Sequence, residues 1–338
     1  MKRNERAYEI AFQIPQHLEE ANRRCSLIGD LEEKVDKIIF VGMGGSGIIG
    51  DIIEEWLEDK TNVEIRVWKD YSLPAWINEE ALIIAISYSG NTEETISATM
   101  EAVRRKSKIA VISSNGKIIK IAEKNRIPHI IVPGIFQPRE AAPYLLIAAI
   151  KILRKIGIIG EYWKEEFKET LSTLKEMQRE IAKDNYVKRI AEKIDGRIII
   201  IYGYRPLRCA ALRLKQQLNE NSKSFAMMGV LPEAGHNEIE GWEENEKLLS
   251  NIAAIFIRDV EEDIRIRKRI EVFESLMKEK NTPTINIYSR GKSRLCRIMS
   301  TIYLGDLISI ELANIKGVDA SRIEAIIKLK RELSKLKG

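Results

Sequence analysis

Short apolar runs and longer amphipathic stretches alternate along most of this chain. In the first half the apolar runs predict strands at 37–42, 63–68, 81–87, 108–113 and 129–132. In the second half they predict strands at 197–203, 223–228, 252–257 and 284–288. Runs that are apolar throughout are typical of strands buried on both faces of a parallel sheet. The pattern therefore predicts an α/β protein with two helix-flanked parallel sheets.

The helical stretches divide the chain into three parts. A helical region over about 5–33 precedes the first sheet, and a charged helical stretch over 161–193 follows a hinge at 157–160. Long helices are expected in the second half at about 206–219, 262–279, 293–315 and 322–336. We predict an N-terminal helical segment followed by two tandem three-layer, doubly wound (flavodoxin-like) units, with boundaries at 1–36, 37–157 and 158–338.

The most informative polar segment is Ser87–Glu94, which follows the third strand and leads into a helix expected over 93–105. Ligands of α/β proteins bind beyond the carboxyl ends of strands, where a helix N-terminus offers N–H groups to an anion. Ser87, Ser89 and Thr92 add hydroxyl donors to this turn. A helix cap needs only one such side chain. The cluster therefore predicts a phosphate-binding turn rather than a simple cap.

A glycine-rich turn, Gly42–Gly47, follows the first strand and precedes a helix expected over 48–57. Glycines allow the backbone to approach a ligand closely. The turn also fits the dinucleotide fingerprint G-x-G-x-x-G, and Asp70 after the second strand keeps a nucleotide site as an alternative. A nicotinamide site has no use for the hydroxyl cluster. The two turns together favour a sugar phosphate.

Composition narrows the classes of function. Apolar residues make up 44% and charged residues 31%, which is typical of a globular protein, and no uninterrupted apolar stretch approaches the length of a membrane span. The net charge is +5, and the basic cluster 265–269 is interpreted as a solvated helix face rather than a nucleic-acid site. Three separated cysteines and three separated histidines predict neither disulfides nor a metal site. We expect a cytoplasmic protein that binds no metal, nucleic acid or membrane.

Two segments of the second half look unlike ordinary helix or loop. Asn219–Lys223 ends a long helix and contains Glu220, and Leu231–Trp242 contains His236. Taken singly, each is more often structural than catalytic, and their value lies in combination with the phosphate turns. The segment 258–262 stands where a second phosphate turn would be, but its acids would repel phosphate. We therefore expect one sugar-phosphate site per chain.

The motifs together resemble those of the bifunctional phosphoglucose/phosphomannose isomerase family. The resemblance is carried by Gly42–Gly47, Ser87–Thr92, Gln137–Arg139, Asn219–Lys223 and Leu231–Trp242. This family belongs to the phosphoglucose isomerase superfamily, which is built of two sugar isomerase domains. The resemblance extends from about residue 37 to the C-terminus. The two phosphate turns are common to all sugar isomerase domains, whereas the last two segments are specific.

The resemblance implies a role for each matching residue. Glu220 matches the base that moves a proton between C1 and C2, and Arg139 matches the arginine near the reacting carbons. His236 matches the histidine that opens the sugar ring. The matching substrate-binding residues, most of them phosphate ligands, are Gly45, Ser46, Ser87, Ser89 and Thr92.

The C-terminal part of the site matches less closely. The family's threonine and lysine fall on Ser321 and Lys328, with Lys330 as the rival of Lys328. The family's prolines are absent around Ser321, although the hydroxyl is kept. A small hydroxyl residue here is expected to leave room for both epimers at C2.

The resemblance also implies the reaction and the partners. It implies interconversion of glucose 6-phosphate, fructose 6-phosphate and mannose 6-phosphate through a cis-enediolate, with no cofactor. It further implies a homodimer in which His236 completes the partner's site. One alternative is a non-catalytic sugar-phosphate sensor, which would lack the set Glu220, Arg139 and His236. Another is an isomerase of a different sugar or amino-sugar phosphate.

Overall fold

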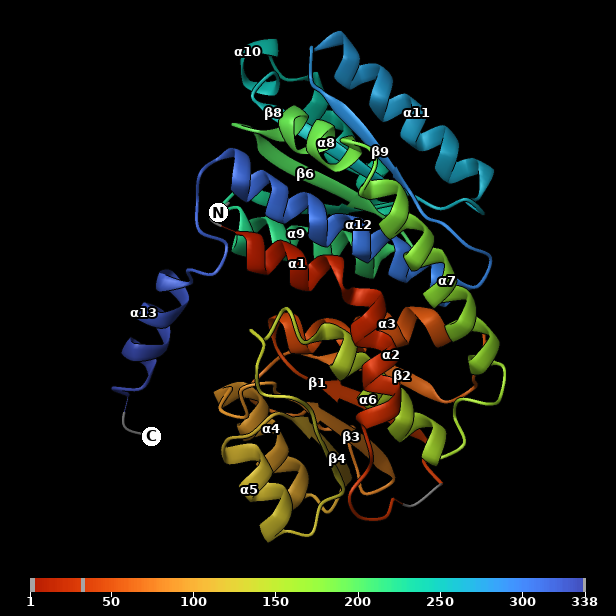
Figure 1. The fold of residues 1–338 in the computed structure, drawn as a ribbon, viewed down its shortest axis with the longest axis vertical. Coiled ribbons are helices and arrows are strands. Elements are labelled where there is room, and N and C mark those ends of the chain that lie inside the picture. Colours follow the sequence, from red (N-terminus) through yellow and green to blue (C-terminus); the bar gives the residue numbers. More distant parts are fainter. Residues whose placement is uncertain (1–3, 32–33, 337–338) are drawn as a thin grey trace.

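The computed structural model describes residues 4–31 and 34–336, and its strands form two separate parallel sheets (Figure 1). The strand order is β2-β1-β3-β4-β5 in the first sheet and β7-β6-β8-β9 in the second. The predicted α/β class with two parallel sheets is confirmed. The strands are β1 (Lys37–Val41), β2 (Glu64–Trp68), β3 (Ala81–Ile86), β4 (Lys108–Ser113), β5 (His129–Ile131), β6 (Ile198–Gly203), β7 (Ala226–Val230), β8 (Ile252–Arg258) and β9 (Thr284–Tyr288).

Helices cover both faces of each sheet. In the first unit α3 and α6 pack on one face and α4 and α5 on the other, and in the second unit α9 packs opposite α11. The helices are α1 (Glu5–Phe12), α2 (Ile14–Arg24), α3 (Gly44–Leu57), α4 (Glu93–Arg104), α5 (Lys117–Lys124), α6 (Ala142–Lys155), α7 (Trp163–Ile181), α8 (Tyr186–Ile194), α9 (Arg208–Asn221), α10 (Glu246–Leu249), α11 (Ile264–Glu279), α12 (Arg294–Ile315) and α13 (Glu324–Leu333), with short 3-10 helices η1 (Glu233–His236) and η2 (Glu238–Glu243).

The strand order reverses beside the first strand of each sheet. In the first sheet β1 lies between β2 and β3, so the connections after β1 and β3 leave toward opposite faces. This opens a crevice at the carboxyl ends of β1 and β3, which is where doubly wound proteins bind ligands. The fold therefore brings the Gly42–Gly47 turn beside the hydroxyl-rich turn Ser87–Glu94.

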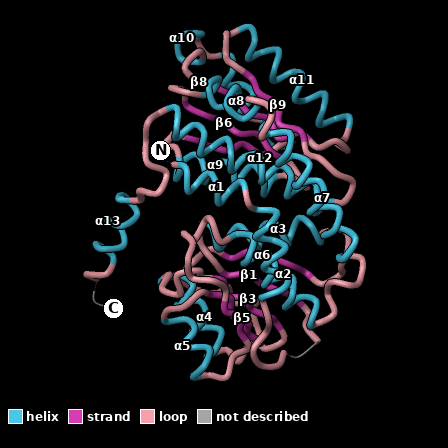
Figure 2. The backbone as a smooth tube through the Cα atoms, in the orientation of Figure 1, coloured by secondary structure: helices cyan, strands magenta, loops and turns pink. Residues whose placement is uncertain are grey.

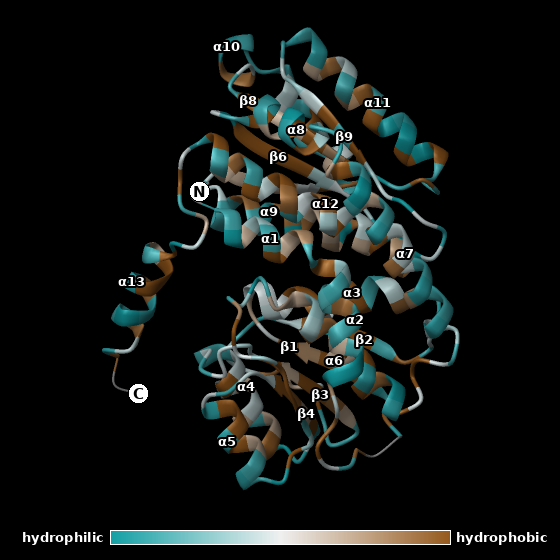
Figure 3. Ribbon diagram, viewed as in Figure 1, coloured by the Kyte–Doolittle hydropathy of each residue, from teal (hydrophilic) through white to brown (hydrophobic). Residues whose placement is uncertain are grey.

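One apolar core runs through both halves of the protein. Alternate residues of β1 face opposite sides, as the period of a strand requires. Ile38 and Phe40 belong to the shared core, whereas Ile39 and Val41 pack toward α4 and α5. Both faces of the strands are therefore hydrophobic, as the brown strands in Figure 3 show.

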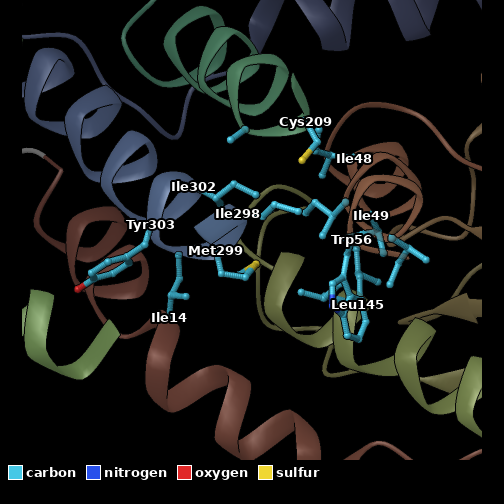
Figure 4. Close-up of a cluster of buried hydrophobic side chains, with 14 of the residues drawn as sticks. Ile14, Ile48, Ile49, Trp56, Leu145, Cys209, Ile298, Met299, Ile302 and Tyr303 are labelled. Atoms are coloured by element: carbon cyan, nitrogen blue, oxygen red, sulfur yellow. The ribbon is translucent and has the colours of Figure 1, made fainter. Parts of the chain in front are cut away.

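The shared core is built where helices of the two halves meet. Figure 4 shows Ile48 and Trp56 of α3 close to Leu145 of α6 and Ile298 of α12. All four side chains are fully buried. Burial of a large apolar side chain contributes about 1.5–3 kcal/mol. This contact joins the two units through a hydrophobic interface rather than a flexible linker.

Helix α12 lies at the centre of the helical layer between the sheets (Figure 2). It packs against α7, α8 and α9. By length and composition alone it could cross a membrane, but 83% of its apolar window is buried inside the protein. Its hydrophobicity is therefore explained by its place in the core.

Several predicted boundaries differ from the structure. The first helical region is two helices that end at Arg24, and the charged stretch 161–193 is interrupted between α7 and α8. Helix α3 already begins at Gly44, so much of the glycine-rich turn is its first turn. Strand β7 begins at Ala226 rather than at 223, because Lys223 adopts a left-handed backbone conformation (φ 52°) that ends the preceding helix.

Candidate active site

A cavity of about 350 Å³ opens at the carboxyl ends of β1 and β3. This volume is typical of a small-molecule site. Two of its walls are the start of α3 and the turn into α4, and the loop before α6 and the end of α9 provide others. Helix α13 borders the remaining side. The lining residues are Met43, Gly44, Gly45, Ser46, Tyr88, Ser89, Asn91, Thr92, Glu93, Glu94, Pro138, Arg139, Glu220, Ile323, Ile326, Leu329, Lys330 and Leu333.

Two helix N-termini open on this cavity. Helix α3 starts at Gly44 and helix α4 starts at Glu93, and both first turns line the space. The partial positive charge and the N–H groups of a helix N-terminus favour an anion. Two such ends at one cavity are suited to a phosphate group.

Glycine is required where Arg139 approaches α3. A Cβ atom on Gly45 would lie 2.9 Å from the Cα atom of Arg139 and 3.0 Å from the carbonyl oxygen of Pro138. Backbone cannot yield as a flexible side chain can. The missing side chain of Gly45 therefore lets the loop before α6 bring Arg139 to the phosphate turns.

One hydroxyl group joins the two turns and another pair holds the second turn together. The N–H of Tyr88 donates to Oγ of Ser46 at 3.1 Å, and Oγ of Ser87 donates to Oγ1 of Thr92 at 3.1 Å. Ser46, Ser89 and Thr92 line the cavity, together with Gly45. Ser87 is fully buried and lies behind Thr92 rather than in the lining. The structure thus gathers most of the predicted phosphate ligands at one place.

Arg139 and Glu220 meet across the cavity. Nη1 of Arg139 lies 3.4 Å from Oε2 of Glu220, and the arginine side chain is 5% exposed while the glutamate is 34% exposed. Burial lowers the pKa of the Arg139 guanidinium, and the charge of Glu220 opposes that shift. Arginine nevertheless stays charged in proteins. A fixed cation therefore stands beside a carboxylate that solvent or substrate can reach.

The guanidinium of Arg139 is held on its other edges by two further groups. Nε donates to Oδ1 of Asn221 at 2.7 Å, and Nη2 donates to the carbonyl oxygen of Ala320 at 2.6 Å. Just after α9, which carries Glu220 and Asn221, Nζ of Lys223 donates to the carbonyl oxygen of Glu220 at 2.6 Å. The segment Asn219–Lys223 thus supplies both the carboxylate and a support for the arginine.

Tyr88 is a site residue that the sequence analysis missed. Its hydroxyl donates to the carbonyl oxygen of Pro133 at 2.8 Å and accepts from the N–H of Phe136 at 2.8 Å. Burial raises the pKa of this phenol, so it remains a neutral donor. Tyr88 therefore ties the phosphate turn to the loop that carries Arg139. The available signal was an aromatic residue between the two serines of a polar turn.

Besides Ser87, three further predicted residues do not line the cavity of this chain. His236 is exposed at the end of η1, on the side of the second sheet where η2 packs against α11. Ser321 is exposed and donates from Oγ to Oδ1 of Asp319 at 2.6 Å. On α13, Lys330 lines the cavity and Lys328 does not. Their roles remain predictions.

In the second sheet, the turn after β8 corresponds to the hydroxyl-rich turn after β3, and its side chains bind other side chains of the protein. The hydroxyl of Tyr204 accepts from the N–H of Asp259 at 2.8 Å and donates to Oε2 of Glu262 at 3.0 Å. Arg258 also pairs with Glu262. The carboxylate of Glu262 is thus bound by Tyr204 and Arg258 of the same unit.

Two family models match the chain. The SIS domain model covers residues 32–143, and the bacterial phospho-glucose isomerase C-terminal SIS domain model covers residues 183–333. Among solved structures, the fold is similar to the C-terminal domain of glucosamine-fructose-6-phosphate aminotransferase from Francisella tularensis. The TM-score is 0.72 at 15% identity, over 94% of this chain and 98% of that one. At this identity the likeness supports the fold alone.

Curated relatives are more informative. The bifunctional phosphoglucose/phosphomannose isomerase of Caldicellulosiruptor bescii is 34% identical over 98% of this chain and 99% of its own length. The protein of the same name from Aquifex aeolicus is 36% identical over 88% of this chain and 90% of its own length. The D-glucosamine-6-phosphate 4-epimerase of Sulfolobus acidocaldarius is 31% identical over 89% of this chain and 90% of its own length. Most of the chain is thus shared with named isomerases, and it belongs to the bifunctional phosphoglucose/phosphomannose isomerase family.

Proposed function

We propose that this protein interconverts glucose 6-phosphate and mannose 6-phosphate with fructose 6-phosphate, as its relatives' names describe. The observation that carries the proposal is the meeting of Glu220 with Arg139 at 3.4 Å in a cavity that two helix N-termini also line. Such a cavity offers a phosphate site, a base and a fixed cation together. The reaction would serve glycolysis and gluconeogenesis in the cytoplasm.

The proton transfer is assigned to Glu220. Its carboxylate would remove the proton α to the carbonyl of the open sugar and return it to the neighbouring carbon. The intermediate is a cis-enediolate, whose oxygens carry the developing negative charge. The guanidinium of Arg139 is the group suited to stabilise that charge, because it is already buried and held in place.

The phosphate is assigned to the hydroxyl-rich turns. Ser46, Ser89 and Thr92 line the cavity beside Gly45, and Ser87 supports Thr92 from behind. These groups are neutral, so the helix N-termini supply the positive potential. Lys330 on α13 is a further cation on the cavity wall.

Ring opening is assigned to His236 with a lysine of α13. Because His236 is exposed and lies outside the cavity of its own chain, its location supports a homodimer in which it enters the partner's site. Histidine titrates in the range needed to exchange protons with the ring oxygen and the anomeric hydroxyl. The helper lysine is Lys328 by resemblance, and the lining of the cavity favours Lys330.

Fructose 6-phosphate incubated with the purified protein is expected to yield both glucose 6-phosphate and mannose 6-phosphate. The two aldoses share one enediolate and differ only in the face of C2 that receives the proton. Separation of the two products by enzymatic or chromatographic assay measures both activities. Activity should be undiminished in EDTA, because the proposed groups transfer protons without a metal.

Variants and alternative substrates distinguish this proposal from the alternative functions. Ser321→Gln should depress mannose 6-phosphate turnover more than glucose 6-phosphate turnover, since Ser321 is assigned the space near C2. Equal losses would remove that assignment.

Glucosamine 6-phosphate should be a poor substrate, and its preference over fructose 6-phosphate would favour an amino-sugar activity like that named for the Sulfolobus relative. Binding of a sugar phosphate without turnover would favour a non-catalytic sensor.

Mixing two inactive variants is expected to restore activity if His236 crosses to the partner. In a dimer of one Glu220→Gln chain and one His236→Ala chain, one of the two sites contains both intact residues. The measurement is activity after subunit exchange, with exchange demonstrated by differently tagged chains. Absence of recovery despite exchange would show that each site is built from a single chain.

A further inference from the structure

Asn4 stands at the start of α1 but does not cap it. An asparagine at this position usually accepts a hydrogen bond from an N–H of the first turn, and the Asn4 side chain makes none. The residue is nevertheless buried, at 3% exposed. A buried amide needs partners, and those of Asn4 lie near the opposite end of the chain.

The Asn4 side chain makes three hydrogen bonds, one with the last turn of α12 and two with the segment that follows it. Nδ2 donates to the carbonyl oxygen of Val318 at 2.9 Å, 314 residues away along the chain, and to Oδ1 of Asn314 at 3.0 Å. Oδ1 accepts from the N–H of Ala320 at 2.8 Å. One donor and one acceptor thus fix the turn 318–320 against the N-terminal helix, and the second donor fixes α12.

The same turn holds the candidate catalytic arginine. Ala320 is fully buried, and its carbonyl oxygen accepts from Nη2 of Arg139 at 2.6 Å. The N–H of Ala320 therefore faces Asn4 while its carbonyl faces Arg139. Asn221 fixes Nε of the same guanidinium at 2.7 Å. With Nε and Nη2 occupied, Nη1 is the nitrogen directed at Glu220.

We infer that Asn4 is a positioning residue of the active site, which acts through Ala320 on the guanidinium of Arg139. The inference rests on the proposed function, because that function assigns to Arg139 the stabilisation of the enediolate. The donors of a guanidinium lie in one rigid plane, so two fixed nitrogens set the direction of the third. Misplacement of a catalytic group by about 1 Å can lower a rate about 100-fold.

A merely structural role for Asn4 makes a different prediction. If Asn4 only anchors α1, its loss lowers the melting temperature and leaves turnover unchanged where the protein is still folded. If Asn4 positions Arg139, its loss lowers kcat and leaves KM nearly constant, because the phosphate is bound by other segments. The split between kcat and KM therefore separates the two roles.

The test compares Asn4→Ala and Asn4→Asp with Asn185→Ala. Asn185 is the matched control, an exposed asparagine that precedes α8 and likewise makes no side-chain capping bond. Asn4→Ala should lower kcat about 10-fold or more with KM for fructose 6-phosphate within about three-fold. Asn4→Asp keeps the acceptor for Ala320 but turns an oxygen toward the acceptor oxygens of Val318 and Asn314, so kcat should fall at least as far as in Asn4→Ala. The control should stay within about two-fold of the wild type.

Hydrogen exchange at Ala320 tests the linkage without any assay of activity. The N–H of Ala320 should exchange faster in Asn4→Ala, because its acceptor is gone, and at the native rate in Asn185→Ala. Unchanged exchange would overturn the linkage, whereas an inactive wild type would overturn the proposed function. Turnover equal to the control in both Asn4 variants would overturn the positioning role. If Asn4→Ala does not fold, Asn314→Ala, which removes only one acceptor of the Asn4 amide, decides by the same measurements.

Discussion

Glu220→Gln is expected to lower kcat at least about 100-fold, the scale of loss when a general base is removed. The amide keeps the size of the side chain but cannot take up the proton. KM should change little, because the proposed phosphate ligands belong to the first unit. Steady-state kinetics measure both quantities, and loss of solvent deuterium incorporation at C2 would show that the proton-transfer step itself has failed.

Glu324→Gln is the matched control for this variant. Glu324 lies at the start of α13, and it and Glu220 line a neighbouring cavity. It pairs with Arg322 and has no assigned part in the chemistry, so its turnover should stay within about two-fold of the wild type. Near-normal turnover in Glu220→Gln would identify another carboxylate as the base. Glu93 and Glu94 line the same cavity and would be examined next.

The sheets could be predicted from the sequence because their strands are buried on both faces. A run such as Ala81–Ile86 has no polar position to suggest another structure, and all six residues are buried. Edge strands are less completely buried, and β7 is one of them. It lies at an edge of its sheet and only two of its five residues are buried, so its apolar signal is weaker and its predicted start was early.

The two polar turns at one edge of the sheet could also be predicted, since a strand, a polar turn and a helix are adjacent in the sequence; that they bind phosphate stays a prediction. The meeting of Arg139 with Glu220 could not, because it depends on how α9 packs against the first unit. Only the family resemblance pointed to that pair. Asn4 gave no signal at all, because an asparagine before a helix is ordinarily a cap. The role of His236 could not be placed in a single chain either, because we propose that its ring enters the active site of a second copy.

Asp306→Ala is expected to lower the free energy of unfolding by about 3–5 kcal/mol, because it leaves a buried charge without its partner. Arg213 of α9 is 2% exposed, and its Nε and Nη2 donate to the two carboxylate oxygens of Asp306 on α12 at 3.0 and 2.8 Å. Denaturant titration measures the loss. The control is Asp184→Ala, which breaks an exposed arginine–aspartate pair of the same two-bond type and should cost less than about 1 kcal/mol.

The double variant Arg213→Met/Asp306→Leu separates stability from activity. Removal of both charges should recover most of the lost free energy, since apolar residues often replace a buried ion pair without cost. Activity should not recover with it. Nη2 of Arg213 also donates to the carbonyl oxygen of Arg139 at 2.7 Å, so the double variant loses a support of the loop that carries Arg139. We expect kcat to stay about 10-fold low or lower. Full activity in a stable double variant would show that Arg213 holds the fold and not the site.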